Sequence, residues 1–279
     1  MKKKRVIKNS LMAFLSLAGM VLISACQSVP ETVFRKNRQS QNNIEKAASK
    51  TVIKSEIVPM NPEIGYEGPR MLIIMAIQNI PNRGRLGDLI RNTVFNGLNS
   101  EAYGEKIIAD YRWQYQDAGK QALQEGGAPS ETWNWEYSET VEGVEIPLER
   151  VLSGITNCFL VSRFREYYLG GAHGMHEKQY FLFDMGKIKK IALDELIRKN
   201  ARMTLRRLIA AKLRAFAGIE GDAPLSQGGF FMDLPEIPEN FFLTPGSLGF
   251  HWDPYEIAPY VMGSIEVLIP YDELMDVLR

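Results

Sequence analysis

The order of helical and strand-like segments is the feature that most constrains the fold of this chain. The two kinds of segment do not alternate as regular βα units, and no internal repeat is visible. Regular alternation would predict a doubly wound parallel sheet, whereas grouped strands and helices favour an α+β fold. We therefore expect an α+β fold with mainly antiparallel sheets, packed helices and two subdomains.

Apolar and alternating runs predict the strands. Residues 71–77 are wholly apolar, which is typical of a central strand buried on both faces. Residues 132–144 alternate and place Trp133, Trp135 and Tyr137 on one face of a strand. Further strands are expected over residues 51–58, 155–169, 179–184, 240–243, 248–252 and 263–269.

Helical periodicity predicts three main helices. Residues 86–98 and 105–124 each place apolar side chains at three- and four-residue intervals. The strongest periodicity covers residues 193–217, which we expect to form one long helix. A short last helix should begin at Pro270, because proline is favoured in the first turn.

The N-terminal residues predict export and lipid attachment. Five Lys and Arg residues precede a short apolar run over residues 11–23, a pattern typical of a secretory signal and too short to span a bilayer comfortably. Ile23-Ser24-Ala25-Cys26 follows and resembles a bacterial lipobox, whose cysteine receives a diacylglycerol. The alternative is an ordinary signal peptide with a coincidental cysteine. We expect residues 1–25 to be a lipoprotein signal peptide and Cys26 to be lipidated.

The region after Cys26 predicts where the folded part begins and where the protein resides. Residues 26–50 are polar and lack a hydrophobic period, which predicts a flexible tether. A subdomain boundary near residues 170–187 would separate an N-terminal α+β subdomain (51–169) from a C-terminal α+β domain (170–279). Gln27 follows the cysteine instead of the usual inner-membrane retention aspartate. In a cell with two membranes, we expect an outer-membrane anchor and a domain that faces the periplasm.

Charge and cysteine content exclude several classes of protein. Removing residues 1–25 leaves 28 basic and 33 acidic residues, a net charge of −5 that argues against nucleic-acid binding. The lipid, rather than surface charge, must then hold the protein at the membrane. Cys158 is the remaining cysteine and lies in an apolar strand-like run, so we expect a buried and unreactive thiol.

Two segments carry a family resemblance. The first includes Tyr168-Leu169-Gly170-Gly171-Ala172-His173-Gly174, Phe181-Leu182-Phe183-Asp184 and Ile191-Ala192-Leu193-Asp194-Glu195-Leu196. The second includes Phe241-Phe242-Leu243-Thr244, Leu248-Gly249-Phe250 and Asp253-Pro254-Tyr255-Glu256-Ile257-Ala258-Pro259-Tyr260, followed by residues 263–270. Together they resemble the extracytoplasmic domain family of the anti-sigma factor RsiV and the peptidoglycan deacetylase PdaC. The likeness extends from about residue 168 to the C-terminus and is looser over residues 51–167.

The resemblance implies a fold, an extracytoplasmic setting and a binding role. In this family the RsiV domain binds lysozyme, while the deacetylase activity of PdaC belongs to a separate domain that is absent here. A lipid anchor stands where RsiV has a membrane helix. The resemblance thus implies a non-catalytic domain that recognises a protein, such as a lysozyme-like hydrolase, or a peptidoglycan component, with no cofactor.

The glycine-rich segment is the first candidate site. Gly170, Gly171 and Gly174 imply a backbone with positive φ or a close approach. His173 could act as a base or ligand, or could cap the turn by hydrogen bonding to nearby backbone. His173 and His176 form an H-x-x-H pair beside Glu177, with His251 elsewhere, but this spacing in a loop is a weak zinc signal and we expect no metal.

Aromatic residues supply the other candidates. Trp133 and Trp135 could stack on sugar rings, although aromatics at this spacing also suit a sheet core. Tyr255 and Tyr260 lie in a segment with two prolines, which predicts a rigid turn. The alternative function is a cell-wall glycan hydrolase or deacetylase in which His173 acts with Glu256 or Asp253. It requires these side chains to converge in one cleft.

Overall fold

The computed structural model describes residues 51–62, 68–126 and 134–279, which belong to one compact unit spanning Ala47–Arg279. The predicted signal peptide, Cys26, the tether and Trp133 lie outside the described residues. Within the described ranges, no helix combines the length and apolar character needed to cross a membrane.

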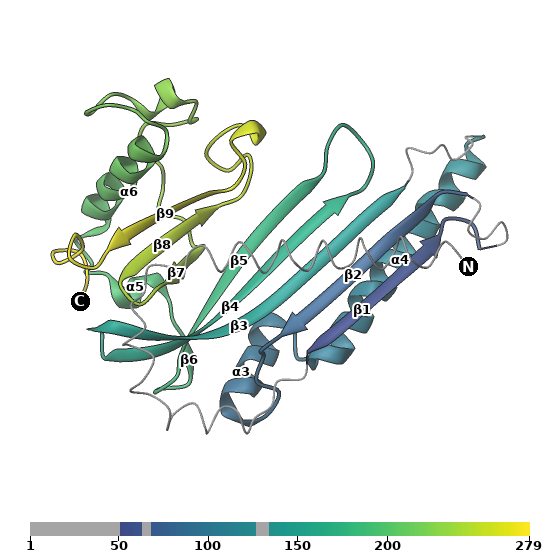
Figure 1. Ribbon diagram of the computed structural model, residues 1–279, viewed down its shortest axis with the longest axis horizontal. Coiled ribbons are helices and arrows are strands. Elements are labelled where there is room, and N and C mark those ends of the chain that lie inside the picture. Colours follow the sequence, from purple (N-terminus) through teal and green to yellow (C-terminus); the bar gives the residue numbers. More distant parts are fainter. Residues whose placement is uncertain (1–50, 63–67, 127–133) are drawn as a thin grey trace, which may run out of the picture. The chain divides into compact units, whose positions relative to one another are not determined.

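A six-stranded sheet in the order β1-β2-β3-β4-β5-β6 forms the larger part of the fold (Figure 1). Its strands are β1 (Val52–Pro59), β2 (Arg70–Gln78), β3 (Trp135–Leu152), β4 (Ile155–Tyr168), β5 (Met175–Asp184) and β6 (Lys189–Lys190). Only the β2–β3 pair of this sheet is parallel, and its other pairs are antiparallel. The predicted α+β class with mainly antiparallel sheets is therefore confirmed.

Two helices cover one face of this sheet. They are α3 (Gly84–Val94) and α4 (Ser100–Gln124), and α4 packs against β1 and β2. The side chain of Asn99 accepts a hydrogen bond from the Ala102 N–H and caps the start of α4. The predicted helices over residues 86–98 and 105–124 are thus present, although α4 begins five residues earlier than its apolar pattern indicates.

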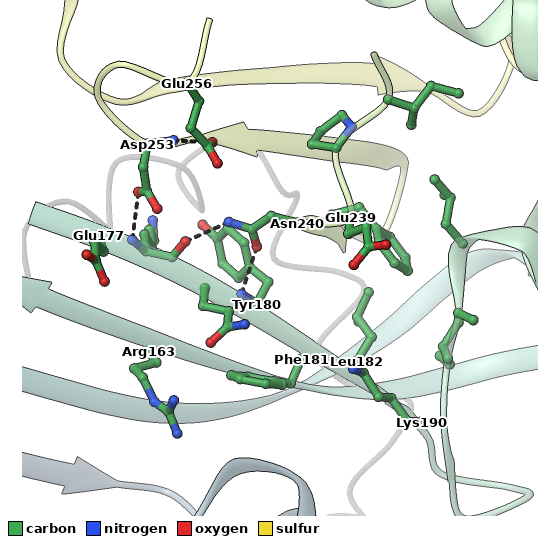
Figure 2. A pocket seen from close by; sticks show the side chains of 18 of the residues that line it. Arg163, Glu177, Tyr180, Phe181, Leu182, Lys190, Glu239, Asn240, Asp253 and Glu256 are labelled. Carbon is green, nitrogen blue, oxygen red and sulfur yellow. Dashed lines mark hydrogen bonds between the residues drawn. The ribbon is translucent and has the colours of Figure 1, made fainter. Parts of the chain in front are cut away.

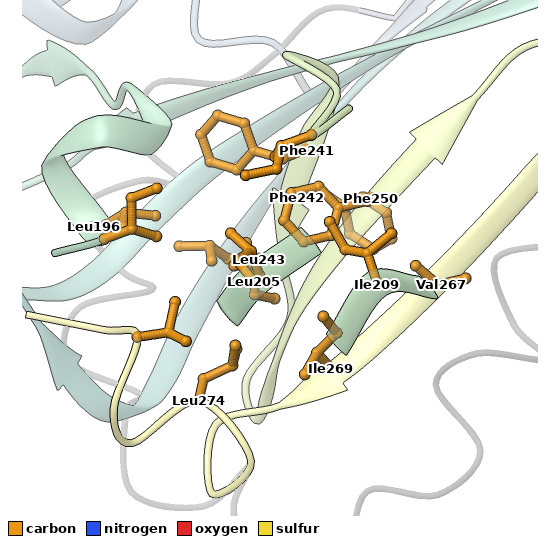
Figure 3. Close-up of a cluster of buried hydrophobic side chains, with 14 of the residues drawn as sticks. Leu196, Leu205, Ile209, Phe241, Phe242, Leu243, Phe250, Val267, Ile269 and Leu274 are labelled. Carbon is orange, nitrogen blue, oxygen red and sulfur yellow. The ribbon is translucent and has the colours of Figure 1, made fainter. Parts of the chain in front are cut away.

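A smaller antiparallel sheet packs with the remaining helices. Its strands are β7 (Phe241–Leu243), β8 (Ser247–Trp252) and β9 (Ile265–Pro270), and the long helix beside it is α6 (Arg202–Phe216). Apolar side chains from α6, this sheet and the C-terminal segment fill one core (Figure 3). Short helical turns occur at α5 (Leu193–Leu196), η5 (Leu225–Gly228) and η6 (Tyr260–Met262).

The strand β4 is buried on both faces because it contributes to two cores. Cys158 and Leu160 join the core that contains α6, whereas Phe159 and Val161 join the core beneath α3 and α4. Successive side chains of a strand point to opposite faces, so a continuous apolar run suits this position. Cys158 is fully buried, and burial raises the pKa of its thiol to about 12, as expected for an unreactive cysteine.

The structure corrects the expected helix over residues 193–217, which is split into α5 and α6. The extended Ile197 separates them, because the backbone here pairs with the C-terminus instead of continuing the helix. The Arg198 N–H donates to the Val277 carbonyl at 2.8 Å, and the Arg279 N–H donates to the Leu196 carbonyl at 2.9 Å. The short helix expected after Pro270 is also wrong, since this segment forms consecutive turns.

The expected subdomain boundary at residue 170 falls between β4 and β5. These strands pair from Cys158↔Asp184 to Tyr167↔Met175 within one sheet. The glycine-rich segment is therefore the turn that joins two long neighbouring strands, and it projects from one end of the sheet (Figure 1).

Candidate functional site

The glycine-rich turn (residues 170–174) and the two-proline loop (residues 253–260) meet in one aromatic cluster. We call it the tyrosine–histidine cluster (His173, His176, Tyr255 and Tyr260). The ring of His173 stacks on Tyr260 with centroids 4.0 Å apart, and Tyr255 lies 5.6 Å from Tyr260. The Tyr260 hydroxyl donates to the Gly174 carbonyl at 2.7 Å, across 86 residues of sequence. Two segments that the sequence singled out separately therefore form one surface.

Local backbone geometry shapes both segments. Gly170 and Gly171 have φ values of +84° and +104°, so the expected need for positive φ is confirmed at these positions. A Cβ at Gly174 would lie 3.2 Å from the Tyr167 carbonyl oxygen, so this glycine permits a close approach. Tyr255 also has positive φ, at +72°, although it is half exposed. Such strain in a large exposed residue accompanies functional sites more often than scaffold positions.

A groove of about 940 Å³ lies beside this cluster and follows the outer edge of β5 (Figure 2). Side chains of β4, β5, residues 190–194, Arg202, residues 237–241 and the Asp253–Glu256 turn line it. Ligand sites are commonly concave and of this size, with a few placed polar groups on an apolar lining. Here Tyr180 and Phe241 supply apolar surface, and Asp253 and Glu256 point toward the groove from the two-proline loop. The lining also carries five basic side chains, which are Arg163, Arg165, Lys178, Lys190 and Arg202.

Side chains, not another strand, satisfy the outer edge of β5 between Lys178 and Tyr180, before β6 pairs with it at Phe183. The side chain of Asn240 accepts from the Tyr180 N–H at 2.9 Å and donates to the Lys178 carbonyl at 2.6 Å. Asp253 accepts from the Lys178 N–H at 2.8 Å. These bonds, drawn in Figure 2, attach the smaller sheet and the two-proline loop to β5.

His251 lies between two carboxylates where β8 and β9 meet β5. Its Nδ1 is 2.9 Å from Glu266, its direct partner in the β8–β9 register, and its Nε2 is 2.9 Å from Asp253. The imidazole is 1% exposed. Glu266 also accepts from the Tyr180 hydroxyl at 2.8 Å and from the Lys178 ammonium at 3.1 Å.

This arrangement shifts two pKa values in opposite directions. Burial disfavours a charged His251, but the hydrogen bonds to Asp253 and Glu266 outweigh it and raise the pKa of the imidazole. Burial would raise the pKa of Glu266, but the hydrogen bond from His251 and the charge of Lys178 lower it to about 2. Both shifts favour an imidazolium beside an ionised Glu266.

His173 does not join the carboxylates that the enzymatic alternative requires. Its Nδ1 lies 2.9 Å from the Gly174 carbonyl oxygen, and its Nε2 lies 3.4 Å from the Tyr255 hydroxyl. Asp253 instead contacts His251, and Glu256 accepts from the Asp253 N–H at 2.7 Å. His251 has both ring nitrogens engaged by carboxylates, so neither is free to take a proton from a substrate.

The remaining predicted site residues are dispersed. Of these, His176 does reach the tyrosine–histidine cluster, with its ring centroid 6.5 Å from that of Tyr260. Its neighbour Glu177 points to the opposite face of β5 and accepts from the Tyr167 hydroxyl at 3.0 Å. Among the described residues, no group of three or more His, Cys, Asp and Glu side chains is arranged to hold a metal ion. Trp135 packs at 5.1 Å from the Tyr115 ring in the core beneath α4, so it does not join the tyrosine–histidine cluster.

Sequence reasoning missed a buried carboxylate, Glu139. It is 1% exposed, accepts from the Tyr103 hydroxyl at 2.9 Å and from Tyr137, and lies 3.3 Å from both Arg163 and Arg165. Burial, and then the charge of Glu139, raise the pKa of both tyrosines. A signal existed, because Glu139 shares the inward phase of the strand with Tyr137 and Val141.

The C-terminal part of the chain is one-sided in charge. Residues 215–278 contain eleven Asp and Glu residues and no Lys or Arg. Several of these acids are exposed, including Asp233, Glu239 and Glu256, and Glu256 lies in the two-proline loop. Exposed apolar side chains accompany them, with Phe231 54% and Val261 89% exposed. The Phe231 N–H donates to the Ile257 carbonyl at 2.9 Å, so these loops contact each other.

Comparisons with known proteins agree with the fold and leave the activity open. No curated protein matches the chain. A crystal structure of a member of the DUF3298 family from Bacteroides fragilis has 21% identity and a TM-score of 0.61, covering 82% of this chain and 92% of that chain. A DUF3298 family protein from Pseudomonas aeruginosa PAO1 has 17% identity and a TM-score of 0.52, covering 83% and 95%. Residues 183–272, which include β7–β9 with His251, Asp253 and Glu266, match the sequence profile of the family described as "Protein of unknown function (DUF3298)".

Proposed function

We propose that this protein is a cell-envelope lipoprotein whose folded part is a non-catalytic binding domain. The partner is a protein, with a lysozyme-like hydrolase as the first candidate, or a peptidoglycan component. The observation that carries the proposal is the convergence of the glycine-rich turn and the two-proline loop in an exposed aromatic cluster beside a groove. Aromatic side chains at such positions are typical anchors of protein and sugar recognition.

The charge distribution favours a basic protein over the other candidates. The lack of Lys and Arg over residues 215–278 leaves the loops around the cluster acidic, with apolar side chains among the carboxylates. These loops are complementary to a cationic protein and repel anionic polymers. The neighbouring groove differs from them, because side chains of both charges line it. The resemblance to the RsiV domain, which binds lysozyme, supports the same class of partner.

The glycan hydrolase or deacetylase alternative has less support. His173 contacts the Gly174 carbonyl and the tyrosines of the cluster. Asp253 instead contacts His251, and Glu256 accepts from the Asp253 backbone N–H. A general base needs a free nitrogen within reach of the proton that it removes. The reaction would require a nucleophile or water held between His173 and a carboxylate. The ring nitrogens of His173 contact Gly174 and Tyr255, so the structure does not supply a histidine–carboxylate pair at this position.

The membrane setting is part of the proposal. Lipidation of Cys26 would anchor the protein, and residues 27–50 would let the domain reach partners in the periplasm. The absence of an aspartate after Cys26 supports the outer membrane in a cell with two membranes. Metabolic labelling with a palmitate analogue tests the anchor. A Cys26→Ser variant should lose the label and leave the membrane fraction, and a variant that retains both would refute lipidation at Cys26.

Binding measurements test the proposed recognition. The chain from residue 27 onward should bind a cationic lysozyme in calorimetry or interferometry, with affinity that falls as salt rises. Tyr255→Ala and Tyr260→Ala should each weaken binding by about tenfold or more, as expected for aromatic anchors. Trp113→Ala is the matched control, because Trp113 is a 67% exposed aromatic on α4.

Purified peptidoglycan sacculi separate the two partner classes. Sedimentation with sacculi but no binding to lysozyme would move the assignment to the glycan. No binding in either assay, or an equal loss in the Trp113→Ala control, would refute the proposed site.

A further inference from the structure

We propose that His251 is a protonation latch that holds the start of the two-proline loop against β5. When His251 loses its proton, the Asp253 end of the loop is released and the tyrosine–histidine cluster loses its arrangement. The structural part of this proposal stands on geometry alone. Its consequence for binding rests on the proposed function and is tested separately.

The latch follows from the number of protons that an imidazole carries. Both nitrogens of His251 lie 2.9 Å from a carboxylate oxygen, Nδ1 from Glu266 and Nε2 from Asp253. A carboxylate can only accept, so both contacts are hydrogen bonds only if the ring carries two protons. A neutral ring keeps one N–H and turns a lone pair toward the other carboxylate. At 1% exposure, water cannot readily replace the lost bond.

Other groups around His251 determine which contact fails. From β5, the Tyr180 hydroxyl and the Lys178 ammonium both bind Glu266, so this carboxylate keeps two donors when His251 is neutral. Asp253 keeps only the Lys178 N–H, at 2.8 Å. Because these two donors and its position in β9 hold Glu266 against the ring, a lone pair on Nδ1 would face a carboxylate that cannot move away. Asp253 follows the end of β8 and starts a turn, so it can move. The remaining proton therefore stays on Nδ1, and Asp253 is the group that is released.

The other polar contacts near the ring do not change with its protonation. The His251 N–H donates to the Asn240 carbonyl at 3.0 Å, and Glu256 accepts from the Asp253 N–H at 2.7 Å. The Tyr180 and His251 rings are nearly perpendicular, with centroids 5.9 Å apart. These contacts keep β8 in place and confine the release to the residues that follow it.

Release of Asp253 reaches the proposed binding surface directly. Asp253 begins the turn that contains Tyr255, whose positive φ is a strained conformation that the surrounding contacts must maintain. The far end of the loop stays tied through Tyr260 and Gly174. Loss of the Asp253 tie thus frees the first half of the loop and moves Tyr255 relative to His173 and Tyr260.

The direction of the pH effect follows from the same contacts. The hydrogen bonds to the two carboxylates and their charges raise the pKa of His251. The latch therefore stays closed at the pH where an ordinary histidine loses its proton, and it opens only at higher pH. The sign is opposite to that of a histidine exposed in an acidic compartment, where protonation disrupts an interface.

Nuclear magnetic resonance tests the structural part on the free protein. The chain contains three histidines, so the ring resonances of His251 can be assigned with His173→Ala and His176→Ala variants. Exchange protection of the Lys178 amide, which donates to Asp253, should fall by about tenfold or more as His251 deprotonates. Amides within β4 serve as controls and should keep their protection across the same pH range.

Two variants make the test decisive. Glu266→Gln keeps an acceptor for Nδ1 but removes a charge, so the transition should move to lower pH by about one unit or more. His251→Gln has no titrating ring, so protection at Lys178 should be low and independent of pH. The latch is refuted if Lys178 protection does not follow His251 in the wild-type chain, or if Glu266→Gln leaves the midpoint unchanged.

Binding to a cationic lysozyme at a series of pH values tests the consequence. Affinity should fall across the transition seen at Lys178, and in Glu266→Gln the fall should shift with it. Binding that is present but insensitive to this transition would overturn the regulatory role while leaving the proposed function intact. If lysozyme does not bind at any pH, the proposed function fails, and the structural latch is still judged by Lys178 exchange.

Discussion

Replacing Glu139 by alanine should destabilise the protein more than almost any other single change. The side chain is fully buried between β3, β4 and α4, and it is the only carboxylate shown to contact both Arg163 and Arg165 in the described residues. Arg163 is 8% exposed, so removal of Glu139 leaves a buried cation without its counter-charge. The Tyr103 and Tyr137 hydroxyls lose their acceptor at the same time.

The size of the effect follows from these losses. Removing one partner of a buried ion pair costs about 3–5 kcal/mol, because the other charge stays desolvated. Arg165 is about one-third exposed and recovers part of its solvation, so it adds little to this figure. For a chain of this size, each kcal/mol lowers Tm by about 2–4 °C, so the expected drop is about 6–20 °C.

Denaturant unfolding measured by circular dichroism is the appropriate assay. Glu136→Ala is the matched control, because Glu136 is an exposed acid on the same strand, and its effect should stay within about 0.5 kcal/mol. Combining Glu139→Ala with Arg163→Ala should cost less than the sum of the two single variants, since each removes the same pair. A loss below about 1 kcal/mol for Glu139→Ala would refute the inference that this carboxylate neutralises the buried arginines.

Three further outcomes test the core, the acid response and the sheet edge. Leu205→Ala, at a fully buried position of α6, should cost about 3 kcal/mol in denaturant unfolding, whereas Met203→Ala on the exposed side of the same helix should be nearly neutral. The pKa of Glu266 is about 2 in the folded protein and about 4.3 in the unfolded chain, so its contribution to stability is complete above pH 4.3 and is lost as pH falls from about 4.3 to about 2. Glu266→Gln should flatten this part of the acid unfolding curve. Asn240→Ala should unpair the Lys178 carbonyl and the Tyr180 N–H and increase self-association in light scattering, whereas Asn200→Ala at an exposed turn should not.

The hydrophobic pattern of the sequence predicted those strands whose conformation depends on residues nearby in the chain. The apolar run of β2 identified a strand that lies between two others, and alternation identified β3. The strands expected over residues 240–243 and 248–252 are present and pair as the β7–β8 hairpin, because the turn and its flanking apolar runs are contiguous. Fold class followed from the order of these segments.

Features that depend on distant residues could not be predicted in this way. The interruption between α5 and α6 comes from hydrogen bonds to residues 277 and 279, which outweigh a strong helical period. The parallel pairing of β2 and β3 depends on how the α3–α4 segment crosses the sheet. The tyrosine–histidine cluster was predicted as two separate motifs, since nothing in the sequence places Tyr260 beside Gly174.

The closure of the β5 edge by Asn240 and Asp253 also sets an order of assembly. The two residues lie 62 and 75 positions after Lys178, so the larger sheet can pair from β1 to β5 long before its edge is covered. A chain that emerges N-terminus first therefore passes through a state with an open strand edge and no C-terminal segment to close it. Truncation before residue 240 would make that transient state permanent, and a shortened chain should aggregate through β5 even though every strand of its larger sheet is intact.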